Sequence, residues 1–312
     1  MKRRAFLTTL AAAAAPPRDY GTTLIHEHIL VDFIGADQVS PSRYNVEEVI
    51  RVALPKLRDL KERGCKTLVE CTPAYLGRDP GLLRKLSAAS GIQILTNTGW
   101  YGANKDKHLP KEAWTYSPDQ IADRWTREFR HGISDTKVIP AFQKIGVDSG
   151  PLSEVDRKLI VAGCLCHKAT GLRMHVHTGD GKAAMDIISE IRKQGLPPSI
   201  YVWVHAQNEK DRKVHEEAGK AGVWLEFDGI NKNSLELHIN AVQELTAAGY
   251  GKQLLISQDS GWYRVGEPGG GTFNGYTYLF DEFLPALKKR GATESQIEHL
   301  LVTNPGTVLK GS

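Results

Sequence analysis

The sequence lacks a block of basic residues, and it lacks a long apolar run. Its formal net charge is +4, and the charged residues are spread along the 312-residue chain. No nucleic-acid partner is therefore expected. The apolar part of the N-terminal segment is far shorter than the ~20 residues of a spanning helix. No later segment is long and apolar enough either, so membrane insertion of the mature chain is not expected.

Cysteine is scarce, and its spacing excludes little. The four cysteines form neither a CxxC pair nor a dense framework, so they neither require nor exclude a disulfide. We interpret all four as small core residues: Cys65, Cys71, Cys164 and Cys166.

The first 17 residues, "MKRRAFLTTLAAAAAPP", have the layout of an export signal. Adjacent Arg3 and Arg4 precede a short apolar, alanine-rich run, and the order is that of a twin-arginine signal. This pattern predicts a periplasmic or secreted protein, with residues 18–312 as the mature domain. The alternative is an N-terminal tail on a cytoplasmic protein.

Eight short β-branched runs alternate with longer amphipathic segments expected to be helical, such as 45–64, 117–132 and 152–171. This alternation predicts a parallel sheet. Eight repeats suit an α/β fold of the (β/α)8 TIM-barrel type, in one domain. An open doubly wound sheet would have a glycine-rich phosphate turn after its first strand, and here that strand ends in His-x-His. The expected strands are 22–28, 66–72, 92–99, 137–147, 172–178, 200–206, 223–229 and 253–259.

The stretch "TTLIHEHIL" ends the first expected strand with two histidines, His26 and His28. Residues i and i+2 of a strand face the same side, so both imidazoles point one way and Glu27 points the other. The pair is either two metal ligands or two hydrogen-bonded core histidines, and this stretch alone does not decide between them.

Further polar residues stand at the ends of other expected strands: Lys144, His177, His205 and Asp259. The carboxyl ends of all strands meet at one rim of a barrel, so these side chains are expected to converge. Zinc and related ions prefer nitrogen and carboxylate ligands. An ammonium beside cations would be repelled, so Lys144 must be neutral, displaced or converted to a carbamate that bridges two metals.

These residues resemble the phosphotriesterase-like branch of the amidohydrolase superfamily, from about Tyr20 to Leu309. The motifs that carry the resemblance are "TLIHEH", "TNTGWY", "KIGVDSG", "HVHTG", "VHAQ", "SQD" and "LLVTNP".

The resemblance implies a binuclear site, with zinc as the expected metal and a small ester or lactone as the substrate. His26, His28 and Asp259 would hold the buried metal, and His177 and His205 the exposed one. Carbamylated Lys144 and a hydroxide would bridge the two metals, and Asp259 would accept the proton. The resemblance also implies a homodimer, although the sequence shows no interface signal.

The sequence departs from the family where substrates are chosen. Asn208 replaces an aspartate that relays the proton in several members, and Glu209 or Asp211 could take its place. His175 is interpreted as a deeper-layer residue. The residues expected near the substrate are Trp100, Tyr101 and Trp262, with the alternative that the aromatics pack beneath loops.

The glycine-rich segment 260–278 has the composition of a lid, or of a flexible surface loop. The leading hypothesis is a binuclear hydrolase of lactones, carboxylic esters or phosphotriesters. One alternative is a mononuclear amidohydrolase such as a deaminase, which would not use Lys144. Another is a barrel that binds metal without catalysis.

Overall fold

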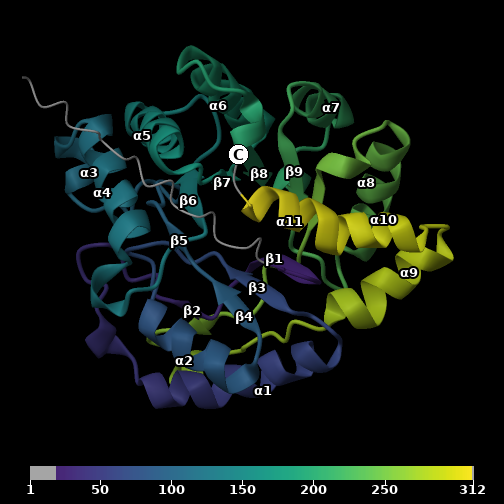
Figure 1. Cartoon of the computed structure of the whole chain (residues 1–312), viewed down its shortest axis with the longest axis horizontal. Coiled ribbons are helices and arrows are strands. Elements are labelled where there is room, and N and C mark those ends of the chain that lie inside the picture. The colour runs from purple at the N-terminus through teal and green to yellow at the C-terminus, as the bar shows by residue number, and fades with distance from the viewer. Residues whose placement is uncertain (1–18, 311–312) are drawn as a thin grey trace, which may run out of the picture.

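The structure is a computed structural model that describes residues 19–310, and all eight expected strands are present in it (Figure 1). The expected strand 92–99 forms as two short pieces, β4 and β5, which are separated by Thr96. The strands are β1 (Thr23–Glu27), β3 (Thr67–Glu70), β4 (Gln93–Leu95), β5 (Asn97–Thr98), β6 (Phe142–Val147), β7 (Met174–Thr178), β8 (Tyr201–Val204), β9 (Trp224–Phe227) and β10 (Leu254–Ile256).

The strands pair in parallel and in chain order. One sheet has the order β1-β3-β4 and the other the order β5-β6-β7-β8-β9-β10. Beyond β10, the N–H of Asp259 donates to the carbonyl of His26 (3.1 Å), and the N–H of His28 donates to the carbonyl of Ser260 (2.8 Å). These bonds join the last strand to the first, and the fold is a (β/α)8 TIM barrel, as the sequence predicts.

Helices surround the strands (Figure 1). The segments expected to be helical at 45–64, 117–132 and 152–171 form α1, α4 and α5. Ser117 starts α4 with a capping box, and Gly132 follows its last residue. The helices are α1 (Val46–Glu62), α2 (Pro80–Ser90), α3 (Glu112–Thr115), α4 (Pro118–His131), α5 (Glu154–Thr170), α6 (Gly181–Lys193), α7 (Arg212–Lys220), α8 (Leu235–Ala247), α9 (Leu284–Lys289), α10 (Glu294–Glu298) and α11 (Asn304–Leu309).

The C-terminal helix α11 covers the amino-terminal end of the barrel. Val308 and Leu309 pack with interior residues such as Ile25 and Val202. Arg173, just before β7, donates to the carbonyls of Thr307 and Val308. Because this end is filled, the opposite rim, where the strands finish, is the one left for a site.

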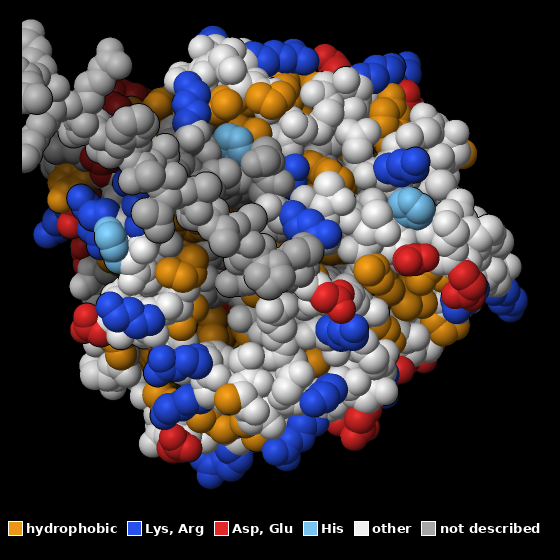
Figure 2. Space-filling view, in the orientation of Figure 1, with side chains coloured by type: hydrophobic (Ala, Val, Ile, Leu, Met, Phe, Trp, Pro, Cys, Tyr) orange, Lys and Arg blue, Asp and Glu red, His pale blue; other side chains and the backbone are white. Residues whose placement is uncertain are grey.

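The burial of the cysteines and the distribution of surface charge match the expectations from the sequence. The four cysteines are free and buried, as predicted for core residues. Lys/Arg and Asp/Glu side chains are interspersed on the face shown in Figure 2. Between residues 19 and 310, no helix has both the length and the apolar character needed to span a bilayer.

The segment after β10 is more firmly attached than a mobile lid or a flexible loop would be. Within it, β11 (Tyr263–Arg264) pairs in parallel with β2 (Leu30–Val31). Near its end, the buried hydroxyl of Tyr276 donates to the carbonyl of His28 (2.7 Å). Both ends of the segment therefore contact the strand that carries the paired histidines.

Gly261 should be intolerant of a side chain. Its φ is +102°, and a Cβ there would lie 1.8 Å from the carbonyl oxygen of His28. Gly249 is the matched control, since its φ is +95° and a Cβ would meet nothing within 4 Å. Urea unfolding should show a loss of about 1 kcal/mol for Gly249→Ala from the backbone alone. Gly261→Ala should lose roughly 2 kcal/mol more, because overpacking adds to the strain. Equal losses would contradict the described contact.

Candidate metal centre

The Nδ1 atoms of His26 and His28, at the end of β1, contact polar side chains from neighbouring strands. The Nδ1–H of His26 donates to Glu226 Oε1 (2.6 Å) and lies 3.1 Å from Asp228 Oδ2. The Nδ1–H of His28 donates to Thr72 Oγ1 (2.8 Å), whose own hydroxyl donates to Glu70. Bonds of this kind fix the tautomer, so that each Nε2 carries a lone pair.

These Nε2 atoms face residues from strands far along the chain. His26 Nε2 lies 3.3 Å from Lys144 Nζ and 3.8 Å from Asp259 Oδ1. His28 Nε2 lies 3.2 Å from the same carboxylate oxygen. Lys144 is 2% exposed, so its amine is enclosed within this cluster.

His205 completes the group from the end of β8. It has a left-handed backbone (φ 61°), and its Nδ1 contacts Asp228 Oδ1 (2.5 Å). Its ring centroid is 5.1 Å from that of His26 and 4.5 Å from that of His177. Asp228 thus contacts His26 and His205 at once and sets the orientation of both rings.

The chemistry of this donor set fits a cation. Asp259 Oδ1 is buried and has no hydrogen-bond partner among the described residues. It faces the lone pair of His28 Nε2, and two acceptors 3.2 Å apart are unfavourable unless a cation lies between them. Two groups have ligating atoms within 4.8 Å of one another: His26, His28 and Asp259, and His26, His205 and Asp228.

The protonation states are those that metal ligands require. Burial lowers the pKa of His26 to about 3 and also lowers the pKa values of His28 and His177. Burial opposes ionisation of Asp259, but the neighbouring histidines, of which His205 is the one that keeps a charge, lower the pKa of this carboxyl. His205 differs, since Asp228 outweighs burial and raises the pKa of His205. Three imidazoles are therefore neutral beside a charged carboxylate.

The mouth of the cluster is lined by aromatic side chains. The hydroxyl of Tyr101 lies 3.1 Å from His177 Nδ1. The ring of Trp262 lies 4.3 Å from that of His28 and stacks on the partly exposed Phe33. Two of the three aromatics expected near the substrate, Tyr101 and Trp262, are therefore next to the histidines.

Trp100 is not brought to this cluster. It is 1% exposed and packs edge-on against Trp125 of α4, with the Arg124 guanidinium 5.7 Å from its ring. This position corresponds to the alternative, an aromatic packed beneath a loop, because the residue turns outward into the helix layer while Tyr101 turns to the mouth.

Other sequence-based expectations also acquire positions. Asn208 is exposed. Glu209 accepts the backbone N–H groups of Gly181, Lys210 and Asp211, and Asp211 is the N-cap of α7. Both carboxylates therefore serve helix and turn geometry, which does not support a role in proton relay. His175 is fully buried beside Phe142, in the deeper layer as expected.

The two carboxylates that contact the histidine rings were not predicted from the sequence. Glu226 and Asp228 are both fully buried at the end of β9. They lie at i and i+2 of the apolar run "VWLEFDG", the same spacing that drew attention to His26 and His28. Two acidic residues on one face of a buried strand were the available signal.

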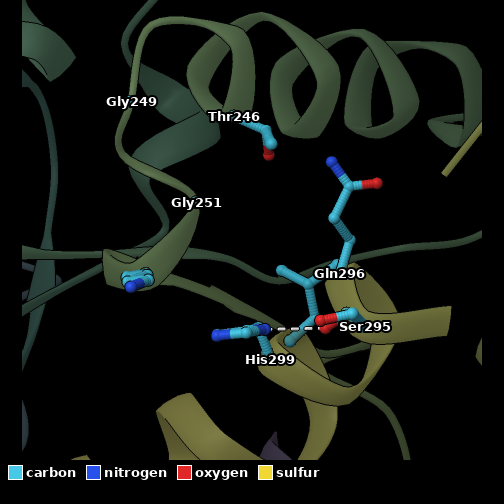
Figure 3. Close-up of a pocket in the computed structure, with 8 residues that line it drawn as sticks. Thr246, Gly249, Gly251, Ser295, Gln296 and His299 are labelled. Carbon is cyan, nitrogen blue, oxygen red and sulfur yellow. Dashed lines mark hydrogen bonds between the residues drawn. The ribbon is translucent and has the colours of Figure 1, made fainter. Parts of the chain in front are cut away.

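A pocket that lies elsewhere in the fold lacks this chemistry. Figure 3 shows the pocket between the end of α8 and α10, lined by Thr246, Gly249, Gln296 and His299 among others. Its histidine bonds the carbonyl of Ser295 (2.7 Å). No group of potential metal ligands was found there among residues 19–310.

A TIM barrel with histidines and carboxylates gathered at the carboxyl ends of its strands defines the class of metal-dependent barrel hydrolases. Comparison places the chain within this class, because the model of the phosphotriesterase family matches residues 7–309. The chain belongs to that family.

Individual relatives match across nearly their whole length. A phosphotriesterase homology protein of Mycobacterium tuberculosis is 27% identical, with 94% of each chain covered. An aryldialkylphosphatase of Saccharolobus solfataricus is 27% identical, covering 92% of this chain and 94% of the relative. A crystal structure of a variant of a phosphotriesterase-like lactonase from Deinococcus radiodurans is 25% identical and superposes with a TM-score of 0.83, covering 95% and 98% of the two chains.

Acid should destabilise the metal-free protein before most carboxylates titrate. The folded pKa of His26 is about 3, below the unfolded value of 6.5, so its stabilising contribution is complete above pH 6.5 and is lost as the pH falls towards 3. Each such histidine costs up to about 1.4 kcal/mol per pH unit in that window. His205 acts in the opposite sense.

Urea unfolding in EDTA at pH 7.5, 6.5 and 5.5 measures this slope. His175 is a control, because burial also lowers its pKa although it is not a proposed ligand. His175→Leu should reduce the slope of the unfolding free energy against pH, by the amount that corresponds to about one proton fewer taken up on unfolding. A free energy of unfolding that is constant from pH 7.5 to 5.5 would show that these histidines are not buried as neutral groups.

Proposed function

We propose that the protein is a binuclear metal-dependent hydrolase that acts on lactones or carboxylic esters ahead of phosphotriesters. The observation that carries this proposal is the convergence of His26, His28, His205, Lys144 and Asp259 on one buried centre at the carboxyl rim. The matched relatives include proteins named as a lactonase and as an aryldialkylphosphatase, which supports ester-type substrates.

In this proposal His26, His28 and Asp259 would hold the buried metal, and His177 and His205 would hold the exposed one. Lys144, whose Nζ lies 3.3 Å from His26 Nε2, would act as a carbamate, because an anion suits a place beside two cations better than an ammonium does. Divalent ions held by these residues, zinc in our proposal, would supply Lewis-acid chemistry, which makes water a nucleophile at neutral pH and polarises a substrate oxygen.

The chain's own residues supply orientation and proton transfer. Asp228 and Glu226 hold the ring of His26, and Asp228 also holds that of His205. Asp259 stays ionised and has a free oxygen facing the centre, so it is the group that accepts a proton from the nucleophile.

The substrate is proposed to enter beside Tyr101 and Trp262. Trp262 covers one side of His28, and its indole N–H donates to the carbonyl of Asp259 (2.7 Å), which fixes the ring over the site. The Tyr101 hydroxyl faces the mouth beside His177 and can donate to a substrate oxygen.

Two further parts of the proposal concern the chain as a whole. Residues 1–17 lie outside the described residues, and their twin-arginine pattern supports export to the periplasm or beyond. A twin-arginine route carries folded proteins, which suits a chain that acquires metal before export. A homodimer is proposed on the family resemblance alone.

Lys144→Ala tests the binuclear proposal. The variant should lose one of two bound metals and on the order of 10²-fold or more in activity. Short carboxylic acids should restore part of it, because they can occupy the place of the carbamate. Metal content after dialysis and ester hydrolysis are the measurements, and exposed Lys252→Ala is the matched control. Full activity in Lys144→Ala would favour the mononuclear alternative.

A substrate panel separates the enzyme from a metal-binding barrel without catalysis. The panel contains lactones, aryl esters and paraoxon-like triesters, each assayed with zinc, cobalt or manganese present. Turnover of lactones or aryl esters is expected. No turnover of any compound by protein that holds two metals would favour the binding protein.

A further inference from the structure

Glu27 is the last residue of β1 and lies between His26 and His28 in the sequence. It is not a ligand in the proposed metal centre. Because side chains alternate along a strand, it points away from the face that His26 and His28 share. It is nevertheless fully buried. A buried carboxyl is costly unless donors surround it, so its contacts indicate what it does.

Among residues 19–310, the hydrogen bonds to the Glu27 carboxyl all come from the segment that follows β10. Oε1 accepts from the Ser257 hydroxyl (2.8 Å) and from the N–H of Gln258 (3.0 Å). Oε2 accepts from the N–H of Ser260 (2.7 Å). The two backbone donors flank Asp259 on either side.

The backbone between these donors has a conformation that needs support. Asp259 has φ +50°, in the left-handed region that non-glycine residues seldom occupy. Its own N–H donates to the carbonyl of His26. Three successive N–H groups are thus held, those of Gln258, Asp259 and Ser260. Glu27 accepts the first and the last of them.

We infer that Glu27 is a positioning residue that sets the place of the Asp259 carboxylate relative to His26 and His28. The inference rests on the proposed function for its consequence in metal binding, but not for its geometry. The side chain of Glu27 takes the place of the regular backbone pairing that would otherwise join β1 to β10, and it leaves Asp259 free to turn inward.

The donors match the two oxygens of Glu27. The Ser257 hydroxyl accepts from the N–H of His26 and so directs its own hydrogen at Glu27. Three donors therefore face two oxygens.

Glu27→Gln tests the inference while it preserves side-chain volume. An amide has one accepting oxygen, so its NH2 group must face either the N–H of Gln258 or that of Ser260. Crystal structures of the metal-free wild type and variant should show the Asp259 carboxylate displaced and the remaining strands unchanged. Zinc affinity, measured by competition with a chelating dye, should fall by about 10–100-fold.

Glu190→Gln is the matched control, since Glu190 is also buried and hydrogen-bonded, on α6 away from the cluster. It should leave zinc affinity unchanged. With any ester that the protein hydrolyses, Glu27→Gln should lower kcat roughly as much as affinity and change KM by less than about threefold. Glu27→Ala removes all acceptors, so it should displace Asp259 further, and lower zinc affinity and kcat more, than Glu27→Gln does.

A double-mutant cycle separates positioning from general loosening. In an Asp259→Ala background, Glu27→Gln should weaken zinc binding by less than about twofold, because the group it positions is gone. An equal loss in both backgrounds, or an Asp259 carboxylate that stays in place in the variant crystal, overturns the inference.

Failure of the proposed function would give a different result. If Asp259→Ala binds zinc as tightly as the wild type, Asp259 is not a ligand. The metal-free crystal structures then decide the positioning role of Glu27 by themselves.

Discussion

The candidate site depends on the joint between the last strand and the first. His26 is in β1 and His28 follows it directly, whereas Asp259 follows β10, and they meet only because the barrel closes there. The joint is made by a few backbone bonds and by side chains of Glu27 and Ser257 rather than by a regular ladder. Such irregular pairing lets the chain turn inward at Asp259, which a regular strand would not permit.

Three of the imidazole rings at the site each have a buried partner that fixes the direction of the ring. The Nδ1 atom of each ring makes the hydrogen bond: His26 to Glu226, His28 to Thr72 and His205 to Asp228. Burying so many polar groups opposes folding, and these bonds offset the loss of water. Among the proposed ligands, the free oxygen of Asp259 and the Nε2 lone pairs of His26 and His28 point to one place. The fold thus leaves a local excess of acceptors, which is the condition that a cation relieves.

The sequence predicted the barrel and most of the cluster, because both follow from periodicity. Eight β-branched runs and their capped helices are local patterns, and His26 and His28 are marked by the alternation of one strand. Glu226 and Asp228 carried the same i, i+2 signal and were overlooked among apolar neighbours. Trp100 and the segment 260–278 could not be placed, since the direction of a loop side chain depends on what packs against it. Only the fold reveals α4 beneath the one and β2 beside the other.

The backbone of one residue, His28, anchors the long segment after β10 at both ends. Its N–H bonds the carbonyl of Ser260, and its carbonyl accepts the Tyr276 hydroxyl. Loops at the rim of a barrel are usually the freely exchangeable part of the fold. Here, deleting or replacing residues 260–278 as a block would leave a buried peptide without its partners. Replacing either end of the segment therefore disturbs the chain next to His26 as well, so the loop and the first strand act as one structural unit.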